Sequence, residues 1–323
     1  MTALDSAPAL PSRPTVDSIG AYRPALLAYC YRMLGSAADA DDAVQETMVR
    51  AWRGLDSFEG RAPLEAWLYR IATNVCLNLL RGRGRRALPM DVSEASSGSA
   101  PLGTARRREA WIEPIPDALI TTPDADPGDL AATRESVRVA FVAALQFLPP
   151  RQRAVLILRD VLRWKADEVA ALLDTSVVSV KSALQRARAT LAAHQPGPAA
   201  PIDRDLLDRY LDAFGRYDVD ELVGLLREDA TLSMPPYDLW LQGPDDIRTW
   251  LLGTGGECAD SAFVPVAVNG TLGFIQRRRS GPGGALEPFG VMVIEGVGGL
   301  VTAMHAFLDP AAVARFELAG SAV

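Results

Sequence analysis

Residues 165–191 read KADEVAALLDTSVVSVKSALQRARATL, and this stretch predicts two short helices separated by a turn. Apolar residues recur in steps of three and four on both sides of the break, which is the period of an amphipathic helix. Between them, Asp174, Thr175 and Ser176 can turn the chain and cap the second helix. We therefore expect a helix-turn-helix unit whose second helix exposes a polar, basic face.

That face has two interpretations. Its polar side chains are Ser179, Lys181, Ser182, Gln185, Arg186 and Arg188. A solvated surface helix would show the same pattern. Alternatively the face reads DNA, because hydroxyls and amides can hydrogen-bond base edges while arginines bind phosphates.

The composition of the 323 residues excludes several classes of protein. Hydrophobic residues make up 49%, and no apolar run approaches the ~18 residues of a membrane span, so we expect two or three globular domains. The N-terminus lacks the basic and apolar parts of a secretory signal. Three scattered cysteines and two histidines fit neither a disulfide framework nor a metal site. We therefore expect a cytoplasmic protein with no metal and no cofactor.

The net charge of −7 is unevenly distributed along the chain. Residues 1–86 carry +2 and residues 135–202 carry +4, whereas residues 203–323 carry −9. The two basic parts can approach nucleic acid, and the acidic part cannot do so easily.

Hydrophobic periodicity and Pro/Gly content divide the chain into segments. We expect a disordered lead at 1–15, a helical bundle at 16–86, a poorly packed linker at 87–131, a second helical unit at 132–194, a short linker at 195–202 and a last domain at 203–323. In the last domain two helices precede apolar segments that alternate with the period of strands. We expect this domain to be α+β, with an antiparallel sheet.

Two sequence blocks closely resemble a known family. DDAVQETMVRAW (41–52) and PLEAWLYRIATNVCLNLLRGRGRR (63–86) resemble region 2 of bacterial sigma-70 factors of the extracytoplasmic-function group. Residues 148–191, from LPPRQRAV to RARATL, resemble region 4 of the same family. The blocks stand in the family's order and cover about half of the chain, which makes chance similarity a poor explanation.

The resemblance implies how region 2 contacts RNA polymerase. In this family region 2 docks on the clamp helices of the polymerase β′ subunit, and the matching residues here are Asp42, Gln45, Glu46, Met48 and Val49. Taken alone, this face would fit an ordinary exposed side of a bundle helix. The resemblance makes docking on the polymerase core, with its β and β′ subunits, the preferred interpretation.

The resemblance also implies the DNA contacts. For the −10 element the expected residues are Arg70, Asn74, Asn78, Arg81, Arg83, Arg85 and Arg86, on a helix expected to run from 64 to 86. For the −35 element they are Ser176, Val178, Ser179, Lys181, Ser182, Gln185, Arg186 and Arg188. An asparagine can offer a donor and an acceptor to one base, and arginines can bind phosphates. The arginine tract would equally suit the C-terminal dipole of a helix.

The last domain resembles the cone-shaped SnoaL-like (polyketide-cyclase-like) fold. MPPYDLWLQG (234–243) and PDDIRTWL (244–251) carry the resemblance, together with the order of helices and strands. Such folds close around an apolar pocket, for which the candidate lining residues are Met234, Tyr237, Asp238, Trp240, Trp250 and His305. An acid–base pair of Asp238 and His305 would make the domain an enzyme. A satisfied core histidine is the more common case, so we expect a ligand-binding or contact role without catalysis.

These observations predict a multidomain sigma factor that directs core polymerase to promoters. Two all-α sigma domains would be followed by an α+β domain that regulates them by intramolecular contact, with a small molecule as a candidate ligand. The alternative is a cyclase or isomerase fused to a DNA-binding module. The region 2 block distinguishes the two hypotheses, because an ordinary helix-turn-helix regulator does not need a region that docks on polymerase.

Overall fold

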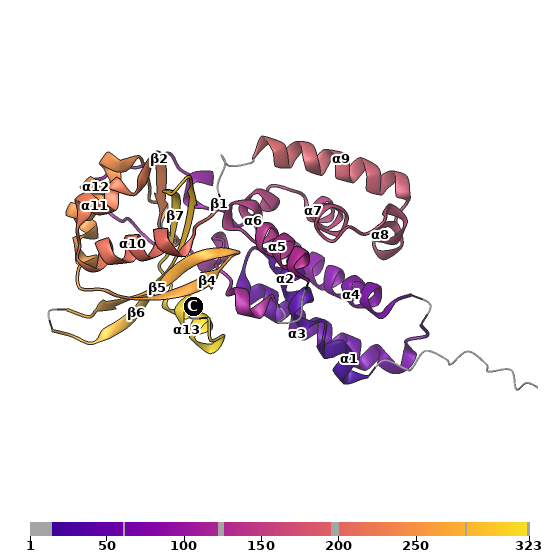
Figure 1. Cartoon of the computed structure of the whole chain (residues 1–323). Helices are drawn as coiled ribbons and strands as arrows, with labels where there is room; N and C mark the ends of the chain where they lie inside the picture. The colour runs from indigo at the N-terminus through magenta and orange to yellow at the C-terminus, as the bar shows by residue number, and fades with distance from the viewer. Residues whose placement is uncertain (1–14, 61, 122–125, 195–199, 282, 322–323) are drawn as a thin grey trace, which may run out of the picture.

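The computed structural model describes residues 15–60, 62–121, 126–194, 200–281 and 283–321. Two helical domains lie side by side, and an α+β domain packs against them (Figure 1), as the sequence predicts. The expected lead, apart from Thr15, lies outside the described residues, as do 195–199 of the short linker. No helix within the described ranges is long and apolar enough to cross a membrane.

The N-terminal helical domain is built around one buried helix. Its helices are α1 (Val16–Gly20), α2 (Arg23–Leu34), α3 (Ala37–Gly54) and α4 (Leu64–Leu79), with a 3₁₀ turn η1 (Leu55–Ser57). Every residue of α2 from Leu26 to Leu34 is buried, because α3, α4, α6 and α7 all pack on this helix. Gly35 ends α2 with a φ of 68°, and the Ser36 hydroxyl then caps α3.

The second helical domain begins at Pro127, a few residues before the expected start. It contains α5 (Pro127–Ser136), α6 (Val139–Gln146), α7 (Pro150–Leu156), the π-helical turn η5 (Ile157–Val161), α8 (Ala166–Leu172) and α9 (Val177–Ala193). Asp174 takes a φ of 51° in the α8–α9 turn, and Ser176 caps α9 as expected. Arg153 of α7 is buried and donates to the carbonyl of Met33 in α2, so the two helical domains are in direct contact.

The C-terminal domain follows the expected order, with two added short strands, at 200–201 and 240–242, and one added helix at 310–318. Its elements are β1 (Ala200–Pro201), α10 (Arg204–Gly215), α11 (Val219–Gly224), β2 (Leu226–Ser233), β3 (Trp240–Gln242), α12 (Pro244–Leu252), η6 (Thr254–Cys258), β4 (Ala262–Val268), β5 (Thr271–Arg279), β6 (Leu286–Val297), β7 (Leu300–Phe307) and α13 (Pro310–Leu318). The strand order is β3-β2-β7-β6-β5-β4, and β1 pairs with β6. The expected antiparallel sheet is wrong for one pair, since β2 and β7 are parallel. The long connection between them allows this pairing.

The two faces of this sheet pack against different partners. The inner face and the helices α10, α11 and α12 enclose a core of their own, which includes Phe214, Trp250 and Met304. The outer face contributes apolar residues such as Val268 and Val293 to a second core, and this core continues through both helical domains. The C-terminal domain is therefore joined to the helical domains by a shared hydrophobic core.

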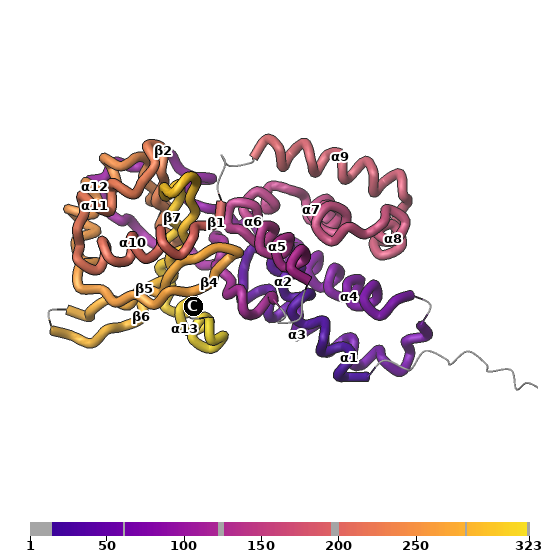
Figure 2. Tube along the Cα trace, in the orientation of Figure 1, coloured from indigo at the N-terminus to yellow at the C-terminus, as the bar shows by residue number. Residues whose placement is uncertain are grey.

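The linker at 87–131 is well packed where it is described, so the expectation of poor packing is wrong. It leaves the N-terminal domain and passes along the C-terminal domain, where the N–H groups of Ser96 and Arg106 donate to the carbonyls of Trp240 and Pro236. It then returns, and Glu113 N–H donates to the carbonyl of Gly35. Its buried residues include Leu88, Trp111, Ile112, Ile115 and Ile120. Figure 2 shows this excursion as the purple trace that crosses to the C-terminal domain.

A two-residue turn between β4 and β5 enters the junction of all these parts. Asn269 and Gly270 have φ values of 50° and 74°, and Asn-Gly is the pair preferred in such tight hairpins. Asn269 is fully buried, and its side-chain N–H groups donate to the Tyr31 hydroxyl (2.7 Å) and the Val137 carbonyl (2.6 Å). Its Oδ1 accepts from Ile115 N–H (2.9 Å). One side chain thus bonds the N-terminal domain, the linker and the second helical domain.

Candidate functional site

One face of α3 has the exposure expected of a docking surface. Asp42, Gln45 and Glu46 are exposed, whereas the opposite face of the helix is buried. Val49 is 40% exposed, and Met48 is half-buried against the core. The sequence prediction omitted Trp52, which is 63% exposed. It lies one further helical turn from Val49, and the spacing of seven from Gln45 is the signal that could have identified it.

Among the described residues, the polar groups on this face have only local, exposed partners. Gln45 Nε2 donates to Asp41 Oδ2 (2.8 Å), and Arg50 pairs with Glu46 at 2.7 Å within the same helix. Exposed pairs of this kind contribute roughly 0–1 kcal/mol each. The face therefore remains available to a partner, with an aromatic residue beside a cluster of carboxylate and amide groups.

The candidate −10 residues on α4 form one exposed row. Arg70, Asn74 and Asn78 recur every four residues and are exposed, while Ala72 and Cys76 are buried. Part of this row faces the second helical domain. Trp67 and Arg70 line a cavity of about 420 Å³ together with Glu168, Ala171 and Leu172 of α8.

The arginine tract that follows α4 differs from the expectation. The helix ends at Leu79 rather than at residue 86, so the tract is not helical. Arg86 is buried, where it pairs with Asp39 (2.8 Å) and donates to the backbone carbonyls of Arg108 and Trp111. Arg86 is therefore a structural residue in this state, because its guanidinium is fully engaged inside the protein.

The other arginines of the tract are more accessible, although two have partners. Arg83 pairs with Asp39 at 2.9 Å. The Arg85 guanidinium lies 3.7 Å from the ring centre of Phe147, the residue that follows α6, which is a cation–π contact between the helical domains. Arg81 is exposed, and within the part of the chain that the structure describes it makes only a 3.3 Å hydrogen bond to Asn78 of the preceding turn.

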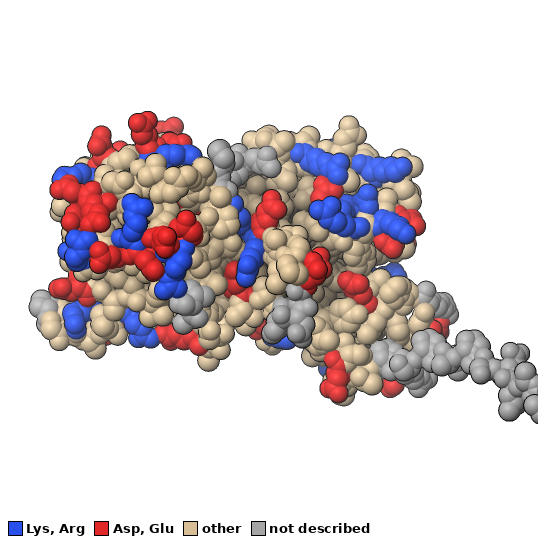
Figure 3. Space-filling view, viewed as in Figure 1, with Lys and Arg blue, Asp and Glu red and all other residues tan. Residues whose placement is uncertain are grey.

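The candidate −35 residues lie on the open side of α9. Val180, Leu184 and Ala187 face the core, whereas Ser179, Lys181, Gln185, Arg186 and Arg188 are exposed, and Ser182 is half-buried. Ser176 is exposed at the N-cap, and Val178 is 76% exposed at the start of the helix. Lys and Arg side chains line this upper edge of the molecule (Figure 3). Arg188 makes two bonds to Asp160, at 2.7 and 2.8 Å.

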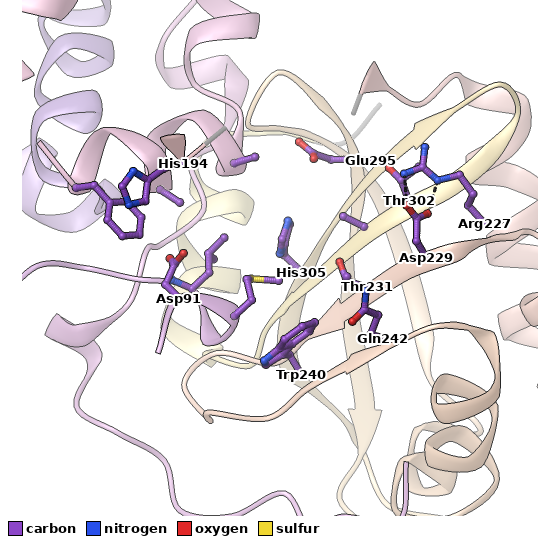
Figure 4. Close-up of a pocket in the computed structure, with 16 residues that line it drawn as sticks. Asp91, His194, Arg227, Asp229, Thr231, Trp240, Gln242, Glu295, Thr302 and His305 are labelled. Carbon is purple, nitrogen blue, oxygen red and sulfur yellow. Dashed lines mark hydrogen bonds and ion pairs between the residues drawn. The ribbon is translucent and has the colours of Figure 1, made fainter. Parts of the chain in front are cut away.

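Four of the six residues predicted to share one pocket lie around two separate cavities, and Tyr237 and Asp238 line neither of them. Met234 and Trp250 line an apolar cavity of about 110 Å³ on the inner face of the sheet. Trp240 and His305 line a cavity of about 450 Å³ on the outer face, beside the linker and α6 (Figure 4). The strand period explains the division, because successive residues of β7, Met304 and His305, point to opposite faces.

The acid–base pair of Asp238 and His305 is not formed. Asp238 pairs with Arg106 of the linker at 2.5 Å. His305 is buried, and its Nδ1 lies 2.9 Å from the Ser233 hydroxyl. Burial lowers the pKa of His305 to about 4, so the ring is neutral at pH 7. Within the described residues no cluster of His, Cys, Asp and Glu could hold a metal ion.

Comparison with known proteins identifies both helical domains. Residues 19–86 match the sigma-70 region 2 family, and residues 138–191 match the sigma-70 region 4 family. The chain is 44% identical over 312 residues to the ECF RNA polymerase sigma factor SigG of Mycobacterium tuberculosis, which covers 93% of this chain and 82% of SigG. The protein belongs to the ECF sigma factor family.

A second relative extends the comparison to the fold. The ECF RNA polymerase sigma factor SigJ of M. tuberculosis is 29% identical over 273 residues, covering 80% of each chain. The crystal structure of SigJ matches with a TM-score of 0.65 at 23% identity, over 93% of this chain and 99% of that one. The fold is thus shared from region 2 through region 4 to the SnoaL-like C-terminal domain. As a sigma factor, the protein acts with RNA polymerase on promoter DNA.

The burial of Arg86 leads to a prediction about stability. Arg86→Ala should lower the free energy of unfolding by about 3 kcal/mol, because it leaves Asp39 and two backbone carbonyls without their buried partner. Arg81→Ala, an exposed change in the same tract, should alter it by no more than ~0.5 kcal/mol. Urea unfolding of the full chain measures both. Equal, small effects would show that Arg86 is a surface residue free to bind DNA.

Proposed function

We propose that this sigma factor is closed when free and that binding of core polymerase opens it. The observation that carries the proposal is the Asn269–Gly270 turn, which hydrogen-bonds region 2, the linker and region 4 together. The C-terminal domain thus regulates the sigma regions by contact. The proposed place of action is the cytoplasm, with core polymerase as the partner.

The dimensions of a promoter support an opening step. Elements centred at −35 and −10 lie about 25 base pairs apart, or about 85 Å along a duplex that rises ~3.4 Å per pair. A compact chain of 323 residues has a radius of gyration of only about 20 Å. Here α4 of region 2 contacts α7 and α8 of region 4. Both regions can engage one promoter only after these contacts separate.

The exposed faces support an order of events. The α3 face is open in the closed form, so docking on the β′ clamp helices through Asp42, Gln45, Glu46, Met48 and Val49 needs no prior rearrangement. The −35 face of α9 is open as well. The −10 row on α4 is partly faced by α8, and Arg85 is stacked on Phe147 of region 4. Contact of α4 with the −10 element therefore follows the separation of the two regions.

A regulatory role is preferred to catalysis in the C-terminal domain. Asp238 is engaged by the linker, and His305 is neutral and hydrogen-bonded to a serine hydroxyl. An acid–base mechanism would need both groups at one substrate. The proposed function therefore needs no cofactor and no metal, and the cyclase alternative has no assembled site to support it.

Docking through α3 can be tested on the surface residues alone. The double variant Gln45→Ala/Glu46→Ala should weaken binding to core polymerase about tenfold or more, because it removes polar groups at the centre of the face. Its unfolding midpoint should stay within the small shift expected of exposed residues. Titration of labelled sigma factor with core polymerase measures the affinity, and Leu318→Ala, at 91% exposure elsewhere, is the control. Unchanged affinity of the double variant would rule out this docking face.

Promoter contact by α9 can be tested through its salt dependence. Lys181→Ala and Arg186→Ala should each weaken binding to every promoter and reduce the slope of log K against log salt by about 0.9 for each phosphate that is no longer neutralised. Ser179→Ala should instead change the base preference at the −35 element. Holoenzyme binding to labelled promoters from 50 to 200 mM salt measures both effects. Unaltered slopes in both charge variants would contradict the assignment.

Closure can be tested by weakening the junction. Asn269→Ala and, more gently, Tyr31→Phe should raise run-off transcription at limiting core polymerase, by about tenfold for Asn269→Ala. The loss of ~1.4 kcal/mol or more of buried hydrogen bonding raises the open fraction by that factor. Leu318→Ala should transcribe like the unchanged chain. If both junction variants are folded by circular dichroism and transcribe normally, the C-terminal domain does not restrain the sigma regions.

A further inference from the structure

We infer that the outer-face cavity of the C-terminal sheet binds a small, uncharged organic molecule that carries hydroxyl or carbonyl groups. The cavity measures about 450 Å³, within the ~300–1,000 Å³ typical of sites for drug-sized molecules. Binding there stabilises the closed form. This consequence rests on the function proposed above, whereas the site itself does not.

Three parts of the chain form the walls of this cavity (Figure 4). On the sheet, cross-strand pairing sets out two rows of side chains, Trp240–Ser233–His305 and Gln242–Thr231–Ala303. The opposite wall is mostly apolar and is made by Leu88 and Met90 of the linker, by Ala140 and Ala143 of α6 and by Phe147 just after this helix. The site therefore has a polar side on the C-terminal domain and an apolar side on the sigma parts.

Thr302 supplies an unpaired polar group in this cavity. Ala303 pairs with Glu295 and Val301 pairs with Gly296, so Thr302 is the extra residue of a β-bulge. Bulges redirect side chains and are common beside functional sites. Thr302 is only 7% exposed, yet no described residue hydrogen-bonds its hydroxyl. An unpaired buried hydroxyl is unfavourable, and a carbonyl or hydroxyl of a bound molecule would satisfy it.

His305 offers a second polar group from the same wall. Its Nδ1 is engaged by the Ser233 hydroxyl, and among the described residues none hydrogen-bonds Nε2. Because the ring is neutral at pH 7, Nε2 can take part in one further hydrogen bond, as donor or acceptor according to the tautomer. Thr302 and His305 thus provide two hydrogen bonds without adding charge.

Three of the four charged residues of the lining, Arg227, Asp229 and Glu295, are paired with an opposite charge. Arg227 pairs with Asp229 through Nη2 and Oδ2 (2.8 Å), and Glu295 pairs with Arg138 (3.0 Å). Asp91 accepts from Leu88 N–H at 2.8 Å. Among the described lining residues an anionic ligand would find no unpaired cation, and a cationic ligand would find only Asp91, which already accepts a backbone hydrogen bond. This balance favours an uncharged molecule.

A molecule in this cavity touches the linker, region 4 and the C-terminal domain together, so it binds the closed form alone. By linkage, a ligand at 100 times its dissociation constant shifts such an equilibrium about 100-fold. The site differs from the inner-face cavity, which measures about 110 Å³ and has Leu102 of the linker among its lining residues. Ligand binding in the outer cavity therefore depends on the relative positions of the linker, region 4 and the C-terminal domain.

The experiment titrates the full chain with prodan (6-propionyl-2-dimethylaminonaphthalene), an uncharged fluorescent probe with one carbonyl. Saturable binding with a blue-shifted emission is expected. Ala303→Leu fills the outer cavity and should weaken binding at least tenfold, whereas Ala306→Leu fills the inner cavity and should leave it unchanged. Thr302→Val should weaken it ~2- to 10-fold, as the loss of one hydrogen bond does.

A second variant distinguishes loss of the binding site from loss of folding. Ala140→Leu places the same added bulk on the α6 wall, so it repeats the test from region 4 if Ala303→Leu unfolds early in a thermal scan. Loss of prodan binding in Ala306→Leu but not in Ala303→Leu or Ala140→Leu would assign the probe to the inner cavity and overturn the inference. Absence of saturable binding to the unchanged chain would overturn it too.

Binding and its consequence are measured separately. Prodan affinity is determined without polymerase and tests the site. Run-off transcription with saturating prodan tests closure, and it should fall for the unchanged chain but not for Ala303→Leu. Specific binding with no effect on transcription would leave the site standing and count against the closed-state function.

Discussion

The arrangement of this sigma factor depends on the buried amide of Asn269. A tight turn with two positive φ values selects Asn-Gly, and here the same geometry directs the Asn side chain out of its own domain. The following residue has to be glycine for a second reason, since a Cβ on Gly270 would lie 2.1 Å from the Arg134 carbonyl oxygen. Asp117 accepts from Gly270 N–H beside it, in a site where burial raises the pKa of that carboxyl to about 6. A local rule of hairpin chemistry therefore also sets the contact between distant domains.

Because of this constraint, the C-terminal domain is a structural part of the sigma regions as well as their proposed regulator. The outer face of its sheet contributes Val268, Ile275, Val293 and Phe307 to the core of the sigma regions. Removal of residues 203–323 would expose this apolar surface, so a deletion would perturb solubility and folding together with regulation. Single changes at the junction separate these effects, because they leave the apolar contact in place.

Periodicity predicted the exposed faces of the helices, and it failed where contacts between residues distant in the sequence determine the structure. The faces of α3, α4 and α9 follow from steps of three and four, which depend only on local sequence. The prediction of a poorly packed linker is wrong, because Trp111 and Ile112 are buried by residues distant in the sequence. In the sequence Arg86 is indistinguishable from its neighbours in the arginine tract. In the structure it is enclosed by Asp39 and by the returning linker. The expected pocket combined residues from the two sides of the sheet. Trp240 and His305 lie on strands and face the outer cavity, whereas Met234 and Trp250 of α12 line the inner one.

The physical character of the junction decides what can open it. Charge complementarity contributes, since Arg138 pairs with Glu295 and Arg108 with Asp309. The junction is held mainly by the burial of apolar side chains and by the uncharged hydrogen bonds of Asn269. Salt screens neither of these interactions strongly. Binding to DNA falls steeply with salt because it releases counterions. Ionic conditions therefore modulate promoter binding far more than closure, and opening requires an interaction with differential affinity for the two states. In the proposed mechanism polymerase provides this interaction by drawing regions 2 and 4 apart, and a molecule in the outer-face cavity would oppose it by holding three parts of the chain together.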